Sequence, residues 1–413
     1  MTNKHFTDTL QRGKRISIMY CIDRYSVLIA SMVIQLCIGG IYAWSTFVTP
    51  LSSDFGLSTT QTQLIFGVTF VVFTTVMVFA GRLQEKRGPR LVAMIGGFMF
   101  GCGYVVASFS GGSFPLILLG IGVISGAGIG FCYVCPLATC IKWFPESKGL
   151  VTGLAVAGFG GGAVLLSLFT GFLIDHGNNI LEVFRVVGFT YGVVLVTSAM
   201  FLRNPKDAFQ KPLDNVPLRQ LLRQRRFWSL ALGMFCGTFA GLMVVGNIKL
   251  IGMSAKLNSE QAGLAISTLA IGNALGRILW GFVHDKIGRC AIPVSLMVLC
   301  IAIIMLLPSA SSETTFALAA ALTGFGFGAC FVVYAAQVTV DYRLNAISNI
   351  YPIIFLAYGL SGILGPPVGG ALFDKTGNYS ASMMVAALIT AFGIITTTLL
   401  ARSRSSHDCL NSC

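Results

Sequence analysis

The chain has 413 residues, of which 55% are apolar and only 10% are charged, and its formal net charge is +13. A soluble domain has about 25% charged residues. A soluble fold of this length could not bury so much apolar surface, which excludes a water-soluble enzyme of two or three domains. None of the four histidines falls within a long apolar run. We therefore expect no metal site, no haem and no other cofactor.

Twelve apolar segments follow one another along the chain, each close to the roughly 20 residues that cross a bilayer. In chain order they cover residues 26–48, 60–80, 91–109, 116–137, 150–172, 183–202, 227–251, 262–283, 291–307, 315–339, 351–372 and 382–400. The 48 glycines suit closely packed membrane helices. The sequence thus predicts an all-α membrane protein with twelve transmembrane helices.

Lysine and arginine are concentrated in alternate connections between these segments, and this pattern predicts the orientation of the chain. They gather in the N-terminal tail, after the second segment, and between the sixth and seventh segments. With both termini in the cytoplasm, 23 of the 28 basic residues lie on the cytoplasmic side. We expect a multi-pass protein of the cytoplasmic (inner) membrane. No basic face of a soluble module is left to bind nucleic acid.

The order of the segments indicates a duplicated bundle. The chain divides into a cytoplasmic tail over 1–25, a six-helix bundle over 26–202, a cytoplasmic linker over 203–226, a second six-helix bundle over 227–400 and a tail over 401–413. The fourth and tenth segments both contain three glycines at alternate positions. Such repeats place a substrate site near the middle of the membrane, between the halves.

Two connections, after the second and the eighth segment, share one pattern of glycine, acid, lysine and glycine. The residues are Gly81, Glu85, Lys86 and Gly88 in the first, and Gly281, Asp285, Lys286 and Gly288 in the second. Glycine lets a helix end turn tightly, and an acid is stabilised near the N-terminus of a neighbouring helix. We predict that these residues latch one conformation of a rocking transporter; the alternative is a pair of solvated charged loops.

The shared pattern, G-x-x-x-[DE]-[KR]-x-G, and the layout of six segments on each side of a linker resemble the major facilitator superfamily over nearly the whole chain. Residues 143–158 are similar to the monocarboxylate-transporter signature at the start of the fifth helix, and residues 365–377 to the end of helix 11 in that group. Residues 40–44 and 273–281 resemble the oxalate/formate antiporter branch. The resemblance implies two bundles around a central cavity walled by helices 1, 4, 7, 8, 10 and 11.

Arg277 is the one charged residue that lies well inside a predicted segment, and no acid occurs in the adjacent segments. An unpaired guanidinium within a membrane is costly and usually functional. Its planar fork matches a carboxylate, so the substrate is expected to be the missing counterion. Asn273 lies one helical turn earlier on the same face. Its amide is predicted to donate to the substrate, with a hydrogen bond between helices as the alternative.

Further candidates for the site are polar or aromatic side chains on the helices that the resemblance places around the cavity. They are Tyr42, Tyr133, Asn247, Phe331, Tyr334 and Tyr358. Packing between helices is the alternative for each of them. The dicarboxylate-exchanging member of the antiporter branch has a lysine where Tyr358 stands, so one cation here favours a monocarboxylate. Animal monocarboxylate transporters have an aspartate where Asn273 stands, and its absence leaves proton coupling open.

We therefore predict a secondary transporter, not an enzyme, that moves small monocarboxylates such as lactate, pyruvate or formate by alternating access. An oxalate/formate-type anion exchanger and an exporter of drugs or other solutes with the same fold are the alternatives. The sequence has no phosphate-binding loop and no hydrolase motif that would favour a pump or a membrane enzyme. The expected partners are a small organic anion and the lipid bilayer, with the chain active as a monomer.

Overall fold

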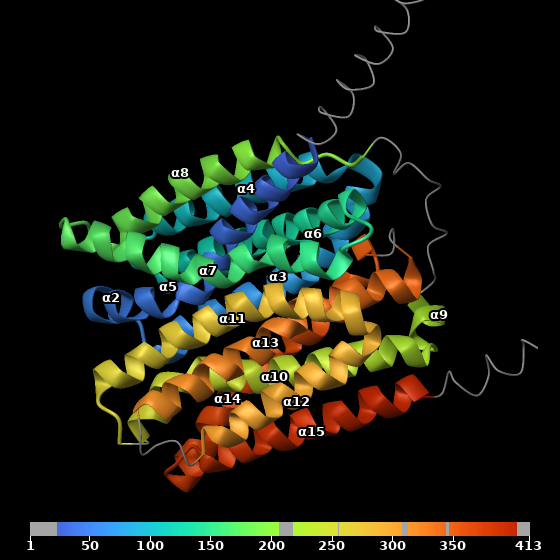
Figure 1. Cartoon of the computed structure of the whole chain (residues 1–413). Coiled ribbons are helices and arrows are strands. Elements are labelled where there is room, and N and C mark those ends of the chain that lie inside the picture. Colours follow the sequence, from blue (N-terminus) through green and yellow to red (C-terminus); the bar gives the residue numbers. More distant parts are fainter. Residues whose placement is uncertain (1–22, 206–217, 255, 308–312, 344–346, 403–413) are drawn as a thin grey trace, which may run out of the picture.

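The protein is helical throughout the part that its computed structural model describes, which comprises residues 23–205, 218–254, 256–307, 313–343 and 347–402. Eleven helical segments in this part are long and apolar enough to cross a membrane. One of them, Leu264–Met305, contains two helices, so the eleven segments cover all twelve predicted spans. The helices lie side by side in two groups, and the predicted all-α membrane class is confirmed (Figure 1).

The first bundle is coloured blue to green in Figure 1 and begins with a helix over residues 23–38. Its other elements are η1 (Gly39–Ala43), α2 (Ser45–Phe55), α3 (Thr59–Arg87), α4 (Pro89–Ser108), α5 (Phe114–Ile117), the π-helix η2 (Leu118–Ser125), α6 (Gly126–Trp143), α7 (Lys148–Asp175) and α8 (Ile180–Ala199). Helix α4 packs against α6 and α8, and α3 packs against α6. These contacts form the core of the first bundle.

The second bundle is coloured yellow-green to red and follows the short helix α9 (Leu218–Leu222). Its elements are α10 (Arg225–Ser254), α11 (Ser259–Ile287), η4 (Gly288–Cys290), α12 (Ala291–Met305), α13 (Glu313–Tyr342), α14 (Tyr351–Thr376) and α15 (Ser380–Arg402). Helix α10 packs against α14 and α15, while α13 packs against α11 and α12. The buried side chains of the two bundles form one continuous apolar cluster.

The first apolar segment is not one continuous helix, although the sequence predicted a single span over residues 26–48. A 3₁₀ turn, η1, interrupts it where the two glycines Gly39 and Gly40 stand. Glycine is a poor helix former, and a Cβ atom at Gly39 would overlap the carbonyl oxygen of Phe159 in α7. The interruption therefore brings the backbone of η1 against α7 and carries Tyr42 on the turn.

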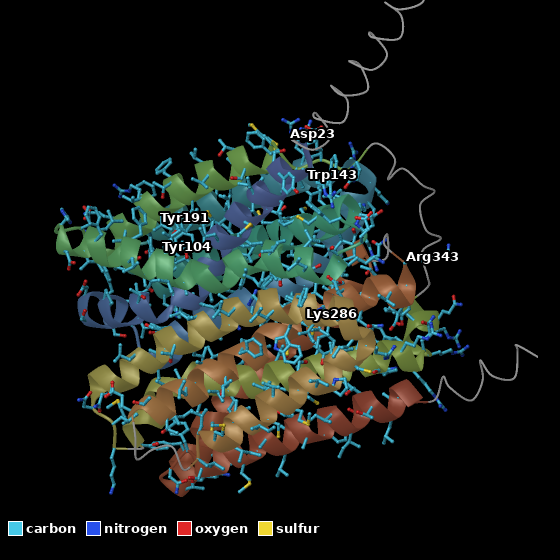
Figure 2. All side chains as sticks on the ribbon, viewed as in Figure 1. Asp23, Tyr104, Trp143, Tyr191, Lys286 and Arg343 are labelled. Atoms are coloured by element: carbon cyan, nitrogen blue, oxygen red, sulfur yellow. The ribbon has the colours of Figure 1, made fainter. Side chains whose placement is uncertain are left out.

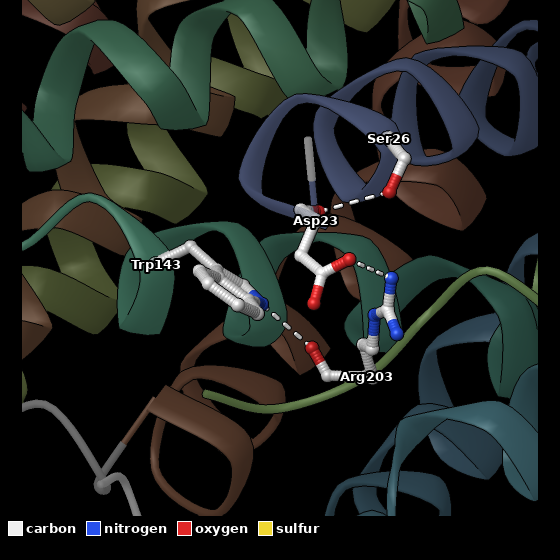
Figure 3. A network of polar contacts seen from close by, with 4 residues as sticks. All are labelled: Asp23, Ser26, Trp143 and Arg203. Carbon is white, nitrogen blue, oxygen red and sulfur yellow. Dashed lines mark hydrogen bonds and ion pairs between the residues drawn. The ribbon is translucent and has the colours of Figure 1, made fainter. Parts of the chain in front are cut away.

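Several chain connections meet at one end of the molecule, which we call the linker end and define by Asp23, Trp143 and Arg203. In Figure 2 Asp23, Trp143 and Arg343 lie toward this end, and Tyr104 and Tyr191 toward the other. Figure 3 shows that Asp23 pairs with Arg203, whose carbonyl oxygen accepts a hydrogen bond of 2.7 Å from Trp143 Nε1. These bonds tie the start of the first helix to the segment after α8.

The two bundles touch mainly along two helix pairs, α7 with α11 and α3 with α14. Glycines allow this close approach at the linker end of both pairs. A Cβ atom at Gly281 of α11 would overlap the carbonyl oxygen of Gly149 in α7, and one at Gly81 of α3 would overlap that of Ser348, just before α14. Gly81 and Gly281, the first glycines of the two glycine–acid–lysine–glycine patterns, thus occupy equivalent positions between the bundles.

Candidate functional site

Arg277 is fully buried between the two bundles. It lies in α11, whose first turn is fixed by a capping box in which Asn258 and Gln261 exchange hydrogen bonds of 2.8 and 3.1 Å. The Arg277 side chain has no exposed surface. Helix α11 packs beside α7 of the first bundle (Figure 1). The guanidinium therefore belongs to the interface across which the halves must move.

The guanidinium makes one hydrogen bond within its own bundle and one to the other bundle. Its Nε donates to the side-chain oxygen of Asn273 at 2.9 Å, and its Nη1 donates to the carbonyl oxygen of Val156 in α7 at 3.1 Å. Its Nη2 is buried and has no hydrogen-bond partner among the described residues. None of the ion pairs in that part of the chain involves Arg277. The site thus has an unsatisfied cationic donor.

Two phenylalanine rings, one from each bundle, flank the guanidinium. Its central carbon lies 4.2 Å from the ring centroid of Phe331 in α13 and 5.3 Å from that of Phe159 in α7. A desolvated cation–π contact contributes about 0.5–2 kcal/mol. Removing an ion from water costs several kcal/mol. The rings therefore offset only part of the cost of burying Arg277, and an anion would still be attracted strongly.

An aromatic cluster extends from these two rings and joins the bundles. The ring centroids of Phe70 in α3 and Tyr358 in α14 are 5.2 Å apart. Phe355 of α14 lies 5.7 Å from Phe73 in α3 and 5.0 Å from Tyr133 in α6. Such ring pairs have specific edge and offset geometries. The cluster thus connects α3 and α6 of the first bundle with α14 of the second.

Three tyrosine hydroxyls belong to this cluster. Those of Tyr42 and Tyr358 are hydrogen-bonded to each other across the bundle interface. The hydroxyl of Tyr133 is buried and has no hydrogen-bond partner among the described residues. The rings of Tyr42 and Tyr133 lie 5.3 and 5.4 Å from that of Phe159, and the ring of Tyr358 lies 5.0 Å from that of Phe331. The structure therefore brings together Arg277, Asn273, Phe331 and these tyrosines, as a shared site requires.

Two of the predicted site residues lie elsewhere in the second bundle. The Tyr334 hydroxyl lies beside Gly233 of α10, where an added Cβ atom would be 2.7 Å from it. The hydroxyl of Tyr334 is thus directed toward α10, whereas the ring of Phe331 lies beside Arg277. Asn247 donates to the carbonyl oxygen of Met243 at 2.9 Å and accepts from Tyr379 at 3.3 Å. These contacts lie within the second bundle, and a role of either residue in a substrate site stays a prediction.

Three groups at the site were not anticipated from the sequence. They are the carbonyl oxygen of Val156 and the rings of Phe159 and Phe355. Phe159 directly follows the stretch that resembles the monocarboxylate-transporter signature, and Phe355 lies about one turn before Tyr358. These neighbouring features of the sequence could have pointed to both phenylalanines. A backbone carbonyl has no sequence signal at all, so the contact with Val156 could only come from the structure.

Asp285 of the second glycine–acid–lysine–glycine loop bonds the N-terminus of a helix in the opposite bundle. Its carboxylate oxygens accept hydrogen bonds from the backbone N–H groups of Gly149 at 2.7 Å and Leu150 at 2.8 Å. These N–H groups belong to the first turn of α7, which has no side-chain cap of its own. A carboxylate at a helix N-terminus stabilises both the free N–H groups and the helix dipole.

The first loop differs from the second. Glu85 pairs with Lys142 of its own bundle, at 3.4 Å, and makes no described bond to α14. Gly88 and Gly288, the C-caps of α3 and α11, both have positive φ, at 82° and 57°. This fits the tight turn that the sequence predicted.

The two lysines of the loops also differ in their surroundings. Lys86 and Lys286 are both exposed, and Lys286 lies 4.5 Å from the ring centroid of Phe282. The two copies of the motif are therefore alike in backbone and different in contacts.

Comparison with known proteins agrees with this architecture. Residues 26–351 match the family model of the Major Facilitator Superfamily. The fold resembles the crystal structure of the transporter FucP in the outward conformation, with a TM-score of 0.68 over 91% of this chain and 98% of that chain, at 14% sequence identity. At this identity the likeness concerns the fold alone.

Three curated relatives cover most of the chain. The uncharacterised MFS-type transporter YhjX of Escherichia coli (strain K12) is 28% identical over 351 residues, which is 83% of this chain and 87% of that protein. An oxalate:formate antiporter of Oxalobacter formigenes is 26% identical, over 90% of this chain and 89% of that protein. Monocarboxylate transporter 11 of Mus musculus is also 26% identical, over 81% and 77%. With a family match over well more than half of its length, this chain belongs to the major facilitator superfamily of membrane transporters.

Proposed function

We propose that the protein is a secondary transporter of small monocarboxylates, such as lactate, pyruvate or formate, and that Arg277 binds the carboxylate. One observation carries the proposal: the guanidinium is fully buried between the bundles, and its Nη2 has no partner among the described residues. An anion neutralises such a group, and a carboxylate matches its planar fork. The oxalate:formate antiporter and the monocarboxylate transporter among the relatives support this substrate class.

The proposed site consists of Arg277, Asn273, Phe331 and the tyrosines at 42, 133 and 358. Arg277 is the only lysine or arginine in the described part of the chain that is fully buried. One cation suits one carboxylate. The surrounding rings of the aromatic cluster favour a substrate with a small body, because a larger one would have to displace them.

In the proposed cycle, the substrate competes with the protein for the same guanidinium. A carboxylate that binds Nη1 and Nη2 takes the place of the Val156 carbonyl, which now links Arg277 to α7. Losing this link weakens the contact between α7 and α11 near the middle of the membrane. The Asp285 contact with α7 remains and acts as a latch at the linker end. Release of this latch allows the bundles to rock and expose the site on the other side.

Uptake of radiolabelled lactate, pyruvate and formate into proteoliposomes tests the proposal. Arg277→Lys keeps the charge but loses the planar fork, so uptake should fall strongly. Arg185→Lys is the matched control, because Arg185 is an exposed arginine 4.9 Å from the ring centroid of Phe109, away from the interface. Normal uptake by Arg277→Ala would refute the anion site. Uptake of only cations or neutral drugs by the unmodified protein would refute the function.

Anion exchange is a second candidate, and one observation favours it over proton symport. No described acid pairs with Arg277, so no side chain at the site is available to carry a coupled proton or to neutralise the empty guanidinium. An exchanger avoids the empty state by binding an anion on every crossing. Preloading the vesicles with unlabelled substrate should then accelerate uptake strongly. Uptake that is driven by a pH gradient and is unaffected by preloading would favour proton symport.

We further propose that the chain acts as a monomer in the cytoplasmic membrane, with two domains over 26–202 and 227–400. The linker over 203–226 and both tails then lie in the cytoplasm, as the positive-inside rule favours. All groups of the proposed site come from one chain. Reporter fusions after α4 and in the linker should report opposite sides of the membrane. A result with both fusions on one side would refute this orientation.

A further inference from the structure

A basic and apolar surface stands on α9 and the first turn of α10, at the linker end of the second bundle. We call it the α9 surface and define it by Leu218, Arg219, Leu222, Arg223 and Trp228. All five side chains are exposed, and the two leucines and the tryptophan are 50%, 41% and 44% exposed. Figure 1 shows α9 at the edge of the molecule, beside the start of α10. The proposed transport site does not involve this surface.

The surface combines basic and apolar side chains over a short stretch of the chain. Leu218, Arg219 and Leu222 lie in α9, and Arg223 lies in the turn that joins α9 to α10. Leu221 is buried and anchors α9 on the protein. Trp228 Nε1 donates to the carbonyl oxygen of Leu222 at 2.7 Å, which fixes α9 against α10. The surface is therefore held in place by the fold.

No acid in the described part of the chain pairs with the two arginines of this surface. Arg219 and Arg223 take part in none of the ion pairs found in the described residues. Arg225 and Arg226 follow directly, and no acidic residue occurs between Leu218 and Asn258. Exposed leucines and a tryptophan beside four arginines do not suit a surface that faces only water. They suit the boundary between lipid headgroups and acyl chains.

The position along the membrane supports the same partner. Helix α10 starts its membrane-spanning segment at Arg225, so Trp228 lies in the first turn of the span. Tryptophan is enriched at that depth, and arginine side chains there reach toward the headgroups. We propose that the α9 surface binds the headgroup of an anionic phospholipid, with Arg219 and Arg223 on the phosphate and Leu218, Leu222 and Trp228 against the acyl chains.

Quenching of tryptophan fluorescence by brominated lipids tests the proposal without any transport measurement. Of the four tryptophans, Trp228 is exposed, whereas Trp44, Trp143 and Trp280 are only 4–5% exposed. Brominated phosphatidylglycerol should quench the protein more strongly than brominated phosphatidylcholine at the same mole fraction. The difference should disappear in Trp228→Phe. Each arginine close to an anionic membrane surface is expected to enrich the lipid about fivefold locally.

The double variant Arg219→Gln/Arg223→Gln should remove most of the preference for phosphatidylglycerol, and added salt should weaken it in the unmodified protein. The double variant Arg82→Gln/Arg90→Gln is the matched control, because it removes two exposed arginines from the first bundle. It should leave the preference unchanged. Equal quenching by both lipids in the unmodified protein, or a preference that survives Arg219→Gln/Arg223→Gln, would overturn the proposal. Both outcomes are independent of which substrate the protein carries.

Discussion

Asn273 acts on Arg277, and its side-chain oxygen is not free for a substrate. That oxygen accepts the 2.9 Å hydrogen bond from Arg277 Nε, and its amide nitrogen is 3.5 Å from the carbonyl oxygen of Gly324. The sequence predicted an amide that donates to the substrate. We propose that its side chain orients the guanidinium without adding a charge, while a contact with the substrate stays a prediction. Asn273 is therefore a positioning residue of the proposed site.

Replacing Asn273 by aspartate should make transport depend on pH. A carboxylate at this position would lie next to Arg277 Nε and compete with the substrate anion for the guanidinium. Its protonation would free Arg277, so uptake by Asn273→Asp should rise as the pH falls. Asn273→Ala removes the bond without adding an acid and should weaken binding about tenfold at every pH. A pH profile of Asn273→Asp that matches that of Asn273→Ala would contradict this role.

Tyr358 should set the number of carboxylates that the site accepts. It is fully buried in the aromatic cluster, close to Arg277, and its hydroxyl bonds that of Tyr42. In Tyr358→Lys, two neighbouring cations would repel each other unless a dianion bridges them. Competition by oxalate against labelled formate should therefore increase. Tyr358→Phe is the control, because it removes the hydroxyl without adding a charge. The prediction fails if both variants respond to oxalate alike.

At the scale of the helices, the two copies of the loop motif should contribute unequally to closure at the linker end. Asp285 bridges the bundles through α7, whereas Glu85 pairs with Lys142 within its own bundle. Asp285→Asn should loosen this end, because a charged cap contributes about 0.5–2 kcal/mol. Glu85→Gln should have little effect. Spin-label distances between the linker ends of α7 and α11 measure this, and equal changes in the two variants would disprove the asymmetry.

Two glycines of α7 provide a matched test of the contact with α11. A Cβ atom at Gly153 would overlap the carbonyl oxygen of Arg277, whereas one at Gly171 of the same helix would meet nothing within 4 Å. Gly153→Ala should therefore push α7 from α11, at a cost of about 1–3 kcal/mol, and lower uptake. Gly171→Ala should leave uptake unchanged. Equal uptake by the two variants would mean that the close approach is dispensable.

At the scale of the whole molecule, the sequence predicted the features that depend on apolar length and on charge. The twelve predicted apolar segments are helical in the structure. Arg277, the one arginine predicted to lie well inside a segment, is fully buried between the bundles. The sequence also named Tyr42, Tyr133 and Tyr358, whose rings the structure places against Phe159 and Phe331, the two rings beside Arg277.

The direction of each apolar side chain could not be predicted in the same way. These helices are apolar all round, so periodicity does not distinguish an interface face from a core face. Tyr334 was therefore indistinguishable from Phe331, and Asn247 from Asn273. The interruption at η1 and the Val156 contact depend on packing between distant segments. Only the folded chain reveals such contacts.

Equilibrium binding of pyruvate and its uncharged analogue pyruvamide tests the central claim most directly. The two ligands differ at the group that Arg277 is proposed to hold. The unmodified protein should bind pyruvate far more tightly. Arg277→Ala should lose about 2–5 kcal/mol of pyruvate affinity, which is roughly 30-fold to several thousand-fold, and should change pyruvamide affinity only a few-fold. Unchanged pyruvate affinity in Arg277→Ala, or an equal loss for both ligands, would contradict the claim that Arg277 binds the substrate carboxylate.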